Sequence, residues 1–174
     1  MRKNASGDLV ALTVKPLLSE VDGDLVRDFL VFFARFEYAL KREGMLKGND
    51  KWAKADWEGY SKRVRELFEP PTSTAIKASV DFLLASPPQK QVVLNGELRF
   101  AAIRKDVGET NASYVLRLVR TVRNNLFHGG KFSEPGGPIA ETSRDRILLL
   151  HALTVLEECA KADSGLKQWL EPSV

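Results

Sequence analysis

The residues best suited to chemistry stand in the segment TVRNNLFHGGKF, residues 121–132. It contains Arg123, Asn124, His128 and Lys131. Histidine has an ordinary pKa near neutrality, so it can donate or accept a proton under physiological conditions. Arginine stays charged and can hold two oxygens of one phosphate group. These residue types could therefore move a proton and stabilise negative charge developing on a phosphate.

A helix is predicted to carry this segment, from about Thr110 to His128. On a helical wheel its apolar stripe falls within an arc of about 60° and comprises Val115, Val119, Val122 and Leu126. A polar face within about 80° comprises Arg117, Arg120, Asn124 and His128. Arg123 lies between the two faces, beside Leu116 and Phe127. No acidic residue occurs between Glu109 and Glu134, so the polar face is cationic.

Two interpretations of this helix follow from the spacing. In the first, the arginines form a solvated face, Gly129 and Gly130 end the helix, and a histidine in the last turn complements the helix dipole. In the second, the cations form a site. Solvated faces usually mix charges of both signs, and the first interpretation does not explain why carboxylates are missing here.

The segment RNNLFHGGK resembles the signature of the HEPN superfamily, in which an arginine is followed by four to six residues and a histidine. Arg123 and His128 match the version with four intervening residues, and Asn124 matches the polar residue that usually follows the arginine. The resemblance implies a metal-independent endoribonuclease of toxin–antitoxin, antiphage or RNA-processing systems. It also implies a homodimer whose two motif helices face one cleft, and an antitoxin or other regulatory protein as a potential partner.

Roles for individual residues follow from the resemblance. Arg123 and His128 would be catalytic, and Asn124 would orient groups in the cleft. The 2′-hydroxyl of RNA would serve as the nucleophile, so no cofactor or metal is expected. Pairing two helices would bury Leu116 and Phe127. The RNA backbone would contact Arg117, Arg120 and Lys131.

Glu37 is a further candidate, on the first predicted helix. It shares an arc with apolar residues, and a carboxylate on such a face is rarely buried without a partner. The resemblance implies that an acidic residue of an earlier helix contacts the motif arginine, which would make Glu37 part of the site. The alternative is a residue at the edge of the core that pairs with a nearby base such as Lys41. Both remain open.

The surrounding chain is predicted to be all-α, a HEPN-like helical bundle of about five main helices. Residues 1–20 are expected to form an irregular arm and residues 21–174 a single domain. The other main helices are predicted from Asp22 or Asp24 to Arg42, from Asn49 or Asp50 to Leu67, from Thr72 to Ala85, and from Thr142 or Ser143 onward. The last of these has an expected stripe of Ile147, Leu150, Leu153, Leu156 and Ala160. Within residues 89–109, QVVL could form a short strand and ELRFAAIRKD favours a helix.

The composition of the chain limits which partners, metal sites and locations are compatible with it. The 174 residues carry a net charge of +3, which permits an RNA partner without requiring one. Cys159 is the only cysteine and His151 is the only other histidine, so disulfides and Cys- or His-based metal sites are not supported. No apolar run approaches membrane-span length. With a single cysteine, a reducing cytoplasm is the expected location. Two alternatives to the ribonuclease remain: a catalytically silent HEPN-type dimerisation or RNA/ligand-binding module, and an unrelated bundle in which HGG ends a helix.

Overall fold

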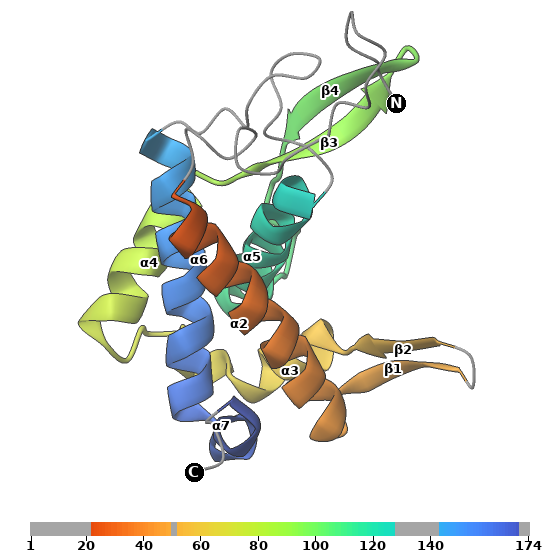
Figure 1. The fold of residues 1–174 in the computed structure, drawn as a ribbon. Helices are drawn as coiled ribbons and strands as arrows, with labels where there is room; N and C mark the ends of the chain where they lie inside the picture. The colour runs from red at the N-terminus through yellow and green to blue at the C-terminus, as the bar shows by residue number, and fades with distance from the viewer. Residues whose placement is uncertain (1–21, 50–51, 128–142, 171–174) are drawn as a thin grey trace, which may run out of the picture.

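The structure is a computed structural model that describes residues 22–49, 52–127 and 143–170. Helices pack side by side in its body, and two β-hairpins project from that body (Figure 1). The helices of the described ranges are α2 (Gly23–Arg42), α3 (Trp57–Arg63), α4 (Thr74–Ala85), α5 (Asn111–Phe127), α6 (Ser143–Ala162) and α7 (Ser164–Leu170), with a 3₁₀ turn η1 (Arg65–Leu67). The strands are β1 (Leu46–Asn49), β2 (Trp52–Ala55), β3 (Gln89–Leu94) and β4 (Glu97–Ala102).

The prediction of an all-α fold is wrong in its strict form, although the described residues are mostly helical. β3 and β4 form an antiparallel hairpin in which Gln89 pairs with Ala102 and Leu94 pairs with Glu97. The two residues between the strands are Asn95 and Gly96, with φ of 53° and 79°. An Asn-Gly pair with positive φ at both positions favours a two-residue hairpin turn. This turn directs ELRFAA into a strand, where a helix was predicted.

The second correction concerns the chain after α2. Leu46–Asn49 pairs antiparallel with Trp52–Ala55 as strands β1 and β2, so the predicted helix from Asn49 or Asp50 begins later. Its N-cap is Asp56, whose Oδ1 accepts a hydrogen bond from the Gly59 amide at 2.9 Å. A side chain that satisfies a free amide of the first turn fixes where a helix begins. The helical periodicity of this region was therefore correct only from Trp57 onward.

Several predicted helix ends are confirmed. Asp22 caps α2, because its Oδ1 accepts a hydrogen bond from the Leu25 amide at 3.1 Å. Gly44 follows the helix with φ of 77°, a left-handed conformation that glycine adopts without a steric cost. Ser73 caps α4 through the Ile76 amide, one residue after the predicted start at Thr72. These signals are local, so they could be identified without tertiary information.

An aromatic cluster joins α2 to α3 at the centre of the core. The ring of Phe36 stacks on the ring of Trp57 with centroids 5.6 Å apart, and the edge of Tyr60 meets Phe36 at 5.5 Å. Phe33 stacks on the same indole at 5.4 Å. Each of these side chains is buried. Offset and edge-to-face aromatic pairs add to the stabilisation from apolar burial, so this cluster fixes α3 against α2.

The predicted stripe of α6 is displaced from the buried face. Ile147 and Leu150 are exposed, whereas the buried side chains are Leu148, Leu149, Ala152, Val155, Leu156, Cys159 and Ala160. The helix contacts α2, α4, α5 and α7. Neighbours on several sides bury a wider arc than one stripe of a two-sided helix. The periodicity therefore identified the helix but not the orientation of its faces.

Candidate functional site

Arg123 and Asn124 of the motif lie near the C-terminal end of α5. Its predicted stripe is confirmed for Val115, Val119 and Val122, which are buried, while Leu126 is half-buried. Leu116 is also a core residue, with an exposed fraction of 1%, so the expectation that dimerisation buries it is wrong. α5 packs against α3, η1, α4 and α6, and these neighbours cover a wider arc than the stripe alone.

Arg123 is half-buried between two aromatic rings. Its guanidinium carbon lies 4.3 Å from the centre of the Phe127 ring and 5.6 Å from that of Phe33. Its Nη1 donates a hydrogen bond to Asn124 Oδ1 at 3.1 Å, which links two of the motif residues. Within the described part of the chain, no carboxylate forms an ion pair with Arg123. Arg123 therefore has its position fixed by cation–π contacts, while its charge has no anionic partner in those residues.

Arg120 and Glu37 meet around Trp57. The indole Nε1 of Trp57 donates a hydrogen bond to Glu37 Oε1 at 2.9 Å, and the Arg120 guanidinium carbon lies 5.9 Å from the indole ring. Arg120 is exposed as a whole, but partial burial of its guanidinium lowers the pKa of Arg120, against the opposing effect of the Glu37 charge. Glu37 forms no ion pair with Arg123 or Lys41 among the described residues. The glutamate is thus connected to the site through Trp57.

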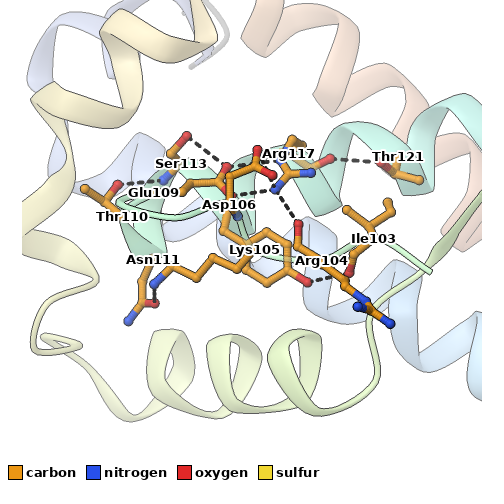
Figure 2. Close-up of polar contacts among 11 residues, drawn as sticks. Ile103, Arg104, Lys105, Asp106, Glu109, Thr110, Asn111, Ser113, Arg117 and Thr121 are labelled. Carbon is orange, nitrogen blue, oxygen red and sulfur yellow. Dashed lines mark hydrogen bonds and ion pairs between the residues drawn. The ribbon is translucent and has the colours of Figure 1, made fainter.

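Arg117 is held differently, because a carboxylate compensates its charge. Its Nε donates to Glu109 Oε1 at 3.0 Å, and its Nη2 donates both to Glu109 Oε2 and to the Arg104 carbonyl, the latter at 2.9 Å (Figure 2). The guanidinium also lies over the Tyr114 ring, at 5.1 Å. Arg117 therefore anchors the loop before α5 to the helix. Glu109 precedes the helix, so the helical wheel could not place it beside Arg117.

The Glu109–Arg117 pair predicts a measurable contribution to stability. Burial raises the pKa of Glu109, but hydrogen bonds from Arg117 and the Asp106 amide offset this, and the net pKa lies below the ordinary value. A carboxyl with a depressed folded-state pKa stabilises the fold above its ordinary pKa, and that stability is lost as the pH falls through the folded-state pKa. We expect Glu109→Gln to lower the free energy of unfolding at pH 7 by about 1.5–3 kcal/mol.

Urea unfolding of the wild type and Glu109→Gln between pH 7 and pH 3 measures this effect, and the difference should shrink in acid. Glu97→Gln is the matched control, because Glu97 pairs with Arg99 on the exposed hairpin. The control should change stability by no more than about 0.5 kcal/mol. Equal effects of the two substitutions would show that the Glu109 contacts contribute no more than a surface pair.

Asn125, whose role was not predicted from the sequence, connects α5 to the β3–β4 hairpin. Its Nδ2 donates a hydrogen bond to the Gln89 carbonyl at 2.8 Å. A cavity of about 210 Å³ lies beside it, lined in part by Phe100, Leu126 and Arg144. Asn125 is two residues beyond Arg123 and therefore about 200° away around the helix. The cavity consequently opens on a different side of α5 from Arg123.

The remaining predicted residues divide into two groups. His128 and Lys131 lie outside the described residues; in the sequence they are one and four positions after Phe127, the described end of α5. His151 has its Nδ1 3.1 Å from Ser79 Oγ and its ring stacked on Phe82 at 4.5 Å, and burial lowers the pKa of His151. These contacts make His151 a half-buried residue at the boundary of the core. Cys159 is buried, and burial raises the pKa of its thiol.

The described residues hold neither a metal-binding cluster nor a membrane-spanning helix. In ranges 22–49, 52–127 and 143–170, no group of three or more His, Cys, Asp or Glu side chains is arranged to hold a metal ion. Across those ranges, every helix is too short or too polar to cross a membrane. Comparison with protein-family models, with curated proteins and with solved structures gave no match to this chain.

Proposed function

We propose that this protein is a metal-independent endoribonuclease of HEPN type, with Arg123 and His128 as its catalytic residues. The proposal rests on one observation. Arg123 is fixed between Phe33 and Phe127 with no carboxylate partner among the described residues, and it stands five positions before the histidine. A guanidinium with no carboxylate partner in the described part of the chain is available to bind a phosphate, whereas Arg117 on the same helix is already bound to Glu109.

The chemistry that these residues would perform is an internal transesterification. The 2′-oxygen of a ribose attacks the adjacent phosphorus, and the bond from phosphorus to the 5′-oxygen of the next nucleotide breaks. The products are a 2′,3′-cyclic phosphate and a 5′-hydroxyl. His128 would take the proton from the 2′-hydroxyl or give one to the leaving oxygen. Arg123 would stabilise the additional negative charge on the phosphate oxygens.

The neighbouring residues have supporting roles in this proposal. Asn124, whose Oδ1 accepts a hydrogen bond from Arg123, would hold that guanidinium in position. Arg120 and Lys131 would contact the RNA backbone. Arg117 would contribute less to that surface because its guanidinium is bound to Glu109. The charge of Glu37 would stabilise the charged form of Arg120. Its hydrogen bond from Trp57 would hold the indole ring in place beside Arg120.

Expression in a bacterial host tests the proposal most directly. Cells producing the wild-type chain should stop growing and show fragmented RNA, whereas cells producing His128→Ala at the same level should do neither. A soluble, folded wild-type chain that leaves growth and RNA intact would instead support the silent binding module. A neutralising antitoxin in the native setting would be recognised as a partner that restores growth.

Cleavage should not depend on a divalent metal. RNA supplies the nucleophile, His128 the acid–base group and Arg123 the cation. We therefore expect the rate of RNA cleavage to be unchanged in excess EDTA. The fragments should carry 2′,3′-cyclic phosphate ends, which phosphatase-coupled labelling or mass spectrometry detects. Loss of activity in EDTA that magnesium restores would contradict this mechanism.

The active unit should be a homodimer. One chain offers Arg120 and Arg123 on one side of a helix, which makes a face instead of an enclosed pocket. A second copy related by a twofold axis would close that face and cover Phe127, which is 59% exposed. Light scattering should then give a mass of about 39 kDa, twice the chain mass of 19.4 kDa. A fully active species with the mass of one chain would exclude a shared cleft.

A further inference from the structure

The β3–β4 hairpin has an apolar face that the described residues leave uncovered. Val93 stands opposite Leu98, and Phe100 stands opposite Gln91. Residues two apart along a strand point to the same face, so Val93, Leu98 and Phe100 form one surface, hereafter the ribbon face. Their exposed fractions are 77%, 63% and 47%. Three large apolar side chains exposed together on one surface are typical of an interaction site.

The hairpin itself also needs support. A two-stranded ribbon in water is marginally stable unless its apolar face packs against another element. At its base the ribbon is tied to α5 by the hydrogen bond from Asn125 to the Gln89 carbonyl. Beyond that base it projects away from the helices (Figure 1). The projecting part is where Val93 and Leu98 lie, close to the turn at Asn95 and Gly96.

The N-terminal part of the chain contains a segment of matching chemistry. Residues 9–14 read LVALTV, five apolar residues and one threonine, followed by Lys15 and Pro16. Valine and threonine are β-branched and favour extended backbone. This segment lies among residues 1–21, which precede the described part of the chain.

The described residues place the start of α2 at the same end of the molecule as the base of the ribbon. Arg146 in the first turn of α6 forms an ion pair with Asp22 at 3.3 Å. Arg144 in the same turn donates to the Pro87 carbonyl at 2.8 Å, two residues before β3. Figure 1 shows the starts of α2, α6 and β3 gathered there. Asp22, to which the N-terminal part of the chain is joined, therefore lies at the end of the molecule that holds the base of the ribbon.

The length of the connecting chain and the high effective concentration of a tethered segment both favour residues 9–14 as the segment that covers the ribbon face. Eight residue steps separate Val14 from Asp22 and can span up to about 29 Å when extended. A six-residue strand is about 20 Å long, so residues 9–14 can reach any part of the ribbon face. A tethered segment acts at an effective concentration in the millimolar range. At micromolar protein, it would occupy the face ahead of a second copy of the chain.

We propose that residues 9–14 pack on the ribbon face and cover Val93, Leu98 and Phe100. The proposal does not depend on the ribonuclease activity, because it concerns only apolar contacts within one chain. It assigns the uncovered apolar surface a defined occupant. It also gives the N-terminal segment a structural role that its sequence alone did not predict.

Disulfide trapping in the full-length chain tests this contact. Leu12→Cys combined with Leu98→Cys should form an intramolecular disulfide under mild oxidation at micromolar protein. Leu12→Cys combined with Val107→Cys is the matched control, since Val107 is fully exposed in the loop between β4 and α5 and is not part of the ribbon face. The native Cys159 is buried and should stay reduced in both variants.

The expected result is at least tenfold faster trapping of the first pair, at the mass of a single chain on a non-reducing gel. Equal rates for the two pairs would overturn the proposal, because they would show an arm with no preferred contact. A disulfide-linked species of twice the mass would overturn it too and would assign the ribbon face to a second copy. A pair that forms no disulfide while far-UV circular dichroism shows a folded chain would exclude the contact.

Discussion

Replacing His128 by alanine should lower the rate of RNA cleavage by about 10²–10⁴-fold, the usual contribution of a general acid–base group. Arg123→Ala should lower it by about 10²–10³-fold, since it removes a positioned donor to the charged phosphate. Both measurements require a purified chain and a defined RNA oligonucleotide under single-turnover conditions. Arg27→Ala is the matched control, because Arg27 is an exposed arginine of α2 that pairs with Asp24 and Asp28.

The fold should survive these substitutions well enough for the rates to be interpreted. Arg123→Ala removes cation–π contacts with Phe33 and Phe127, which contribute about 0.5–2 kcal/mol in all. Arg123→Lys keeps the charge but not the planar group that stacks and binds two oxygens, so we expect partial activity. If Arg123→Ala and His128→Ala both cleave at the wild-type rate, the catalytic assignment is wrong. If either one unfolds, its role is structural.

Truncating Phe36 should have the largest effect on stability. Its ring is fully buried and contacts the rings of Trp57 and Tyr60, so Phe36→Ala leaves a cavity at the centre of the core. We expect a loss of about 3–5 kcal/mol in the free energy of unfolding. Urea denaturation followed by circular dichroism measures this loss.

Val31→Ala is the control for Phe36→Ala, since Val31 is on the same helix but exposed to solvent. It should change the free energy of unfolding by no more than about 0.5 kcal/mol. A loss below about 1 kcal/mol for Phe36→Ala would mean that α2 and α3 are not held together by the aromatic cluster.

The sequence was most informative where structure is determined locally. The predicted bounds of the first and third helices lie close to the observed ones. Asp22 and Ser73 cap the first turn of a helix and Gly44 follows the last turn, so each signal acts within one helical turn. The Asn95–Gly96 turn was also a local signal, and giving it due weight would have predicted the β3–β4 hairpin. β1 and β2 gave little signal, since the residues LKGN and WAKA are mostly exposed and lack apolar alternation.

The candidate site was predictable only in part, for a geometric reason. A helical wheel placed Arg123 correctly at the boundary between faces, because that depends on α5 alone. It misplaced Leu116, whose burial depends on neighbouring helices. The hydrogen bond from Trp57 to Glu37 joins residues 20 positions apart on two helices, with a hairpin between them. Contacts of this kind follow from packing, which one sequence does not specify.

The position of Trp57 has a spectroscopic consequence. Its indole is buried, donates to Glu37 and lies beneath the Arg120 guanidinium, whereas Trp52 is exposed and Trp169 is half-buried. In a chain with Trp52→Phe and Trp169→Phe, Trp57 is the sole tryptophan and its emission reports on a single location. An anion that draws Arg120 away from the ring would alter the quenching of that emission. Occupancy of the cationic face could then be titrated by intrinsic fluorescence, with an uncleavable RNA analogue and no attached label.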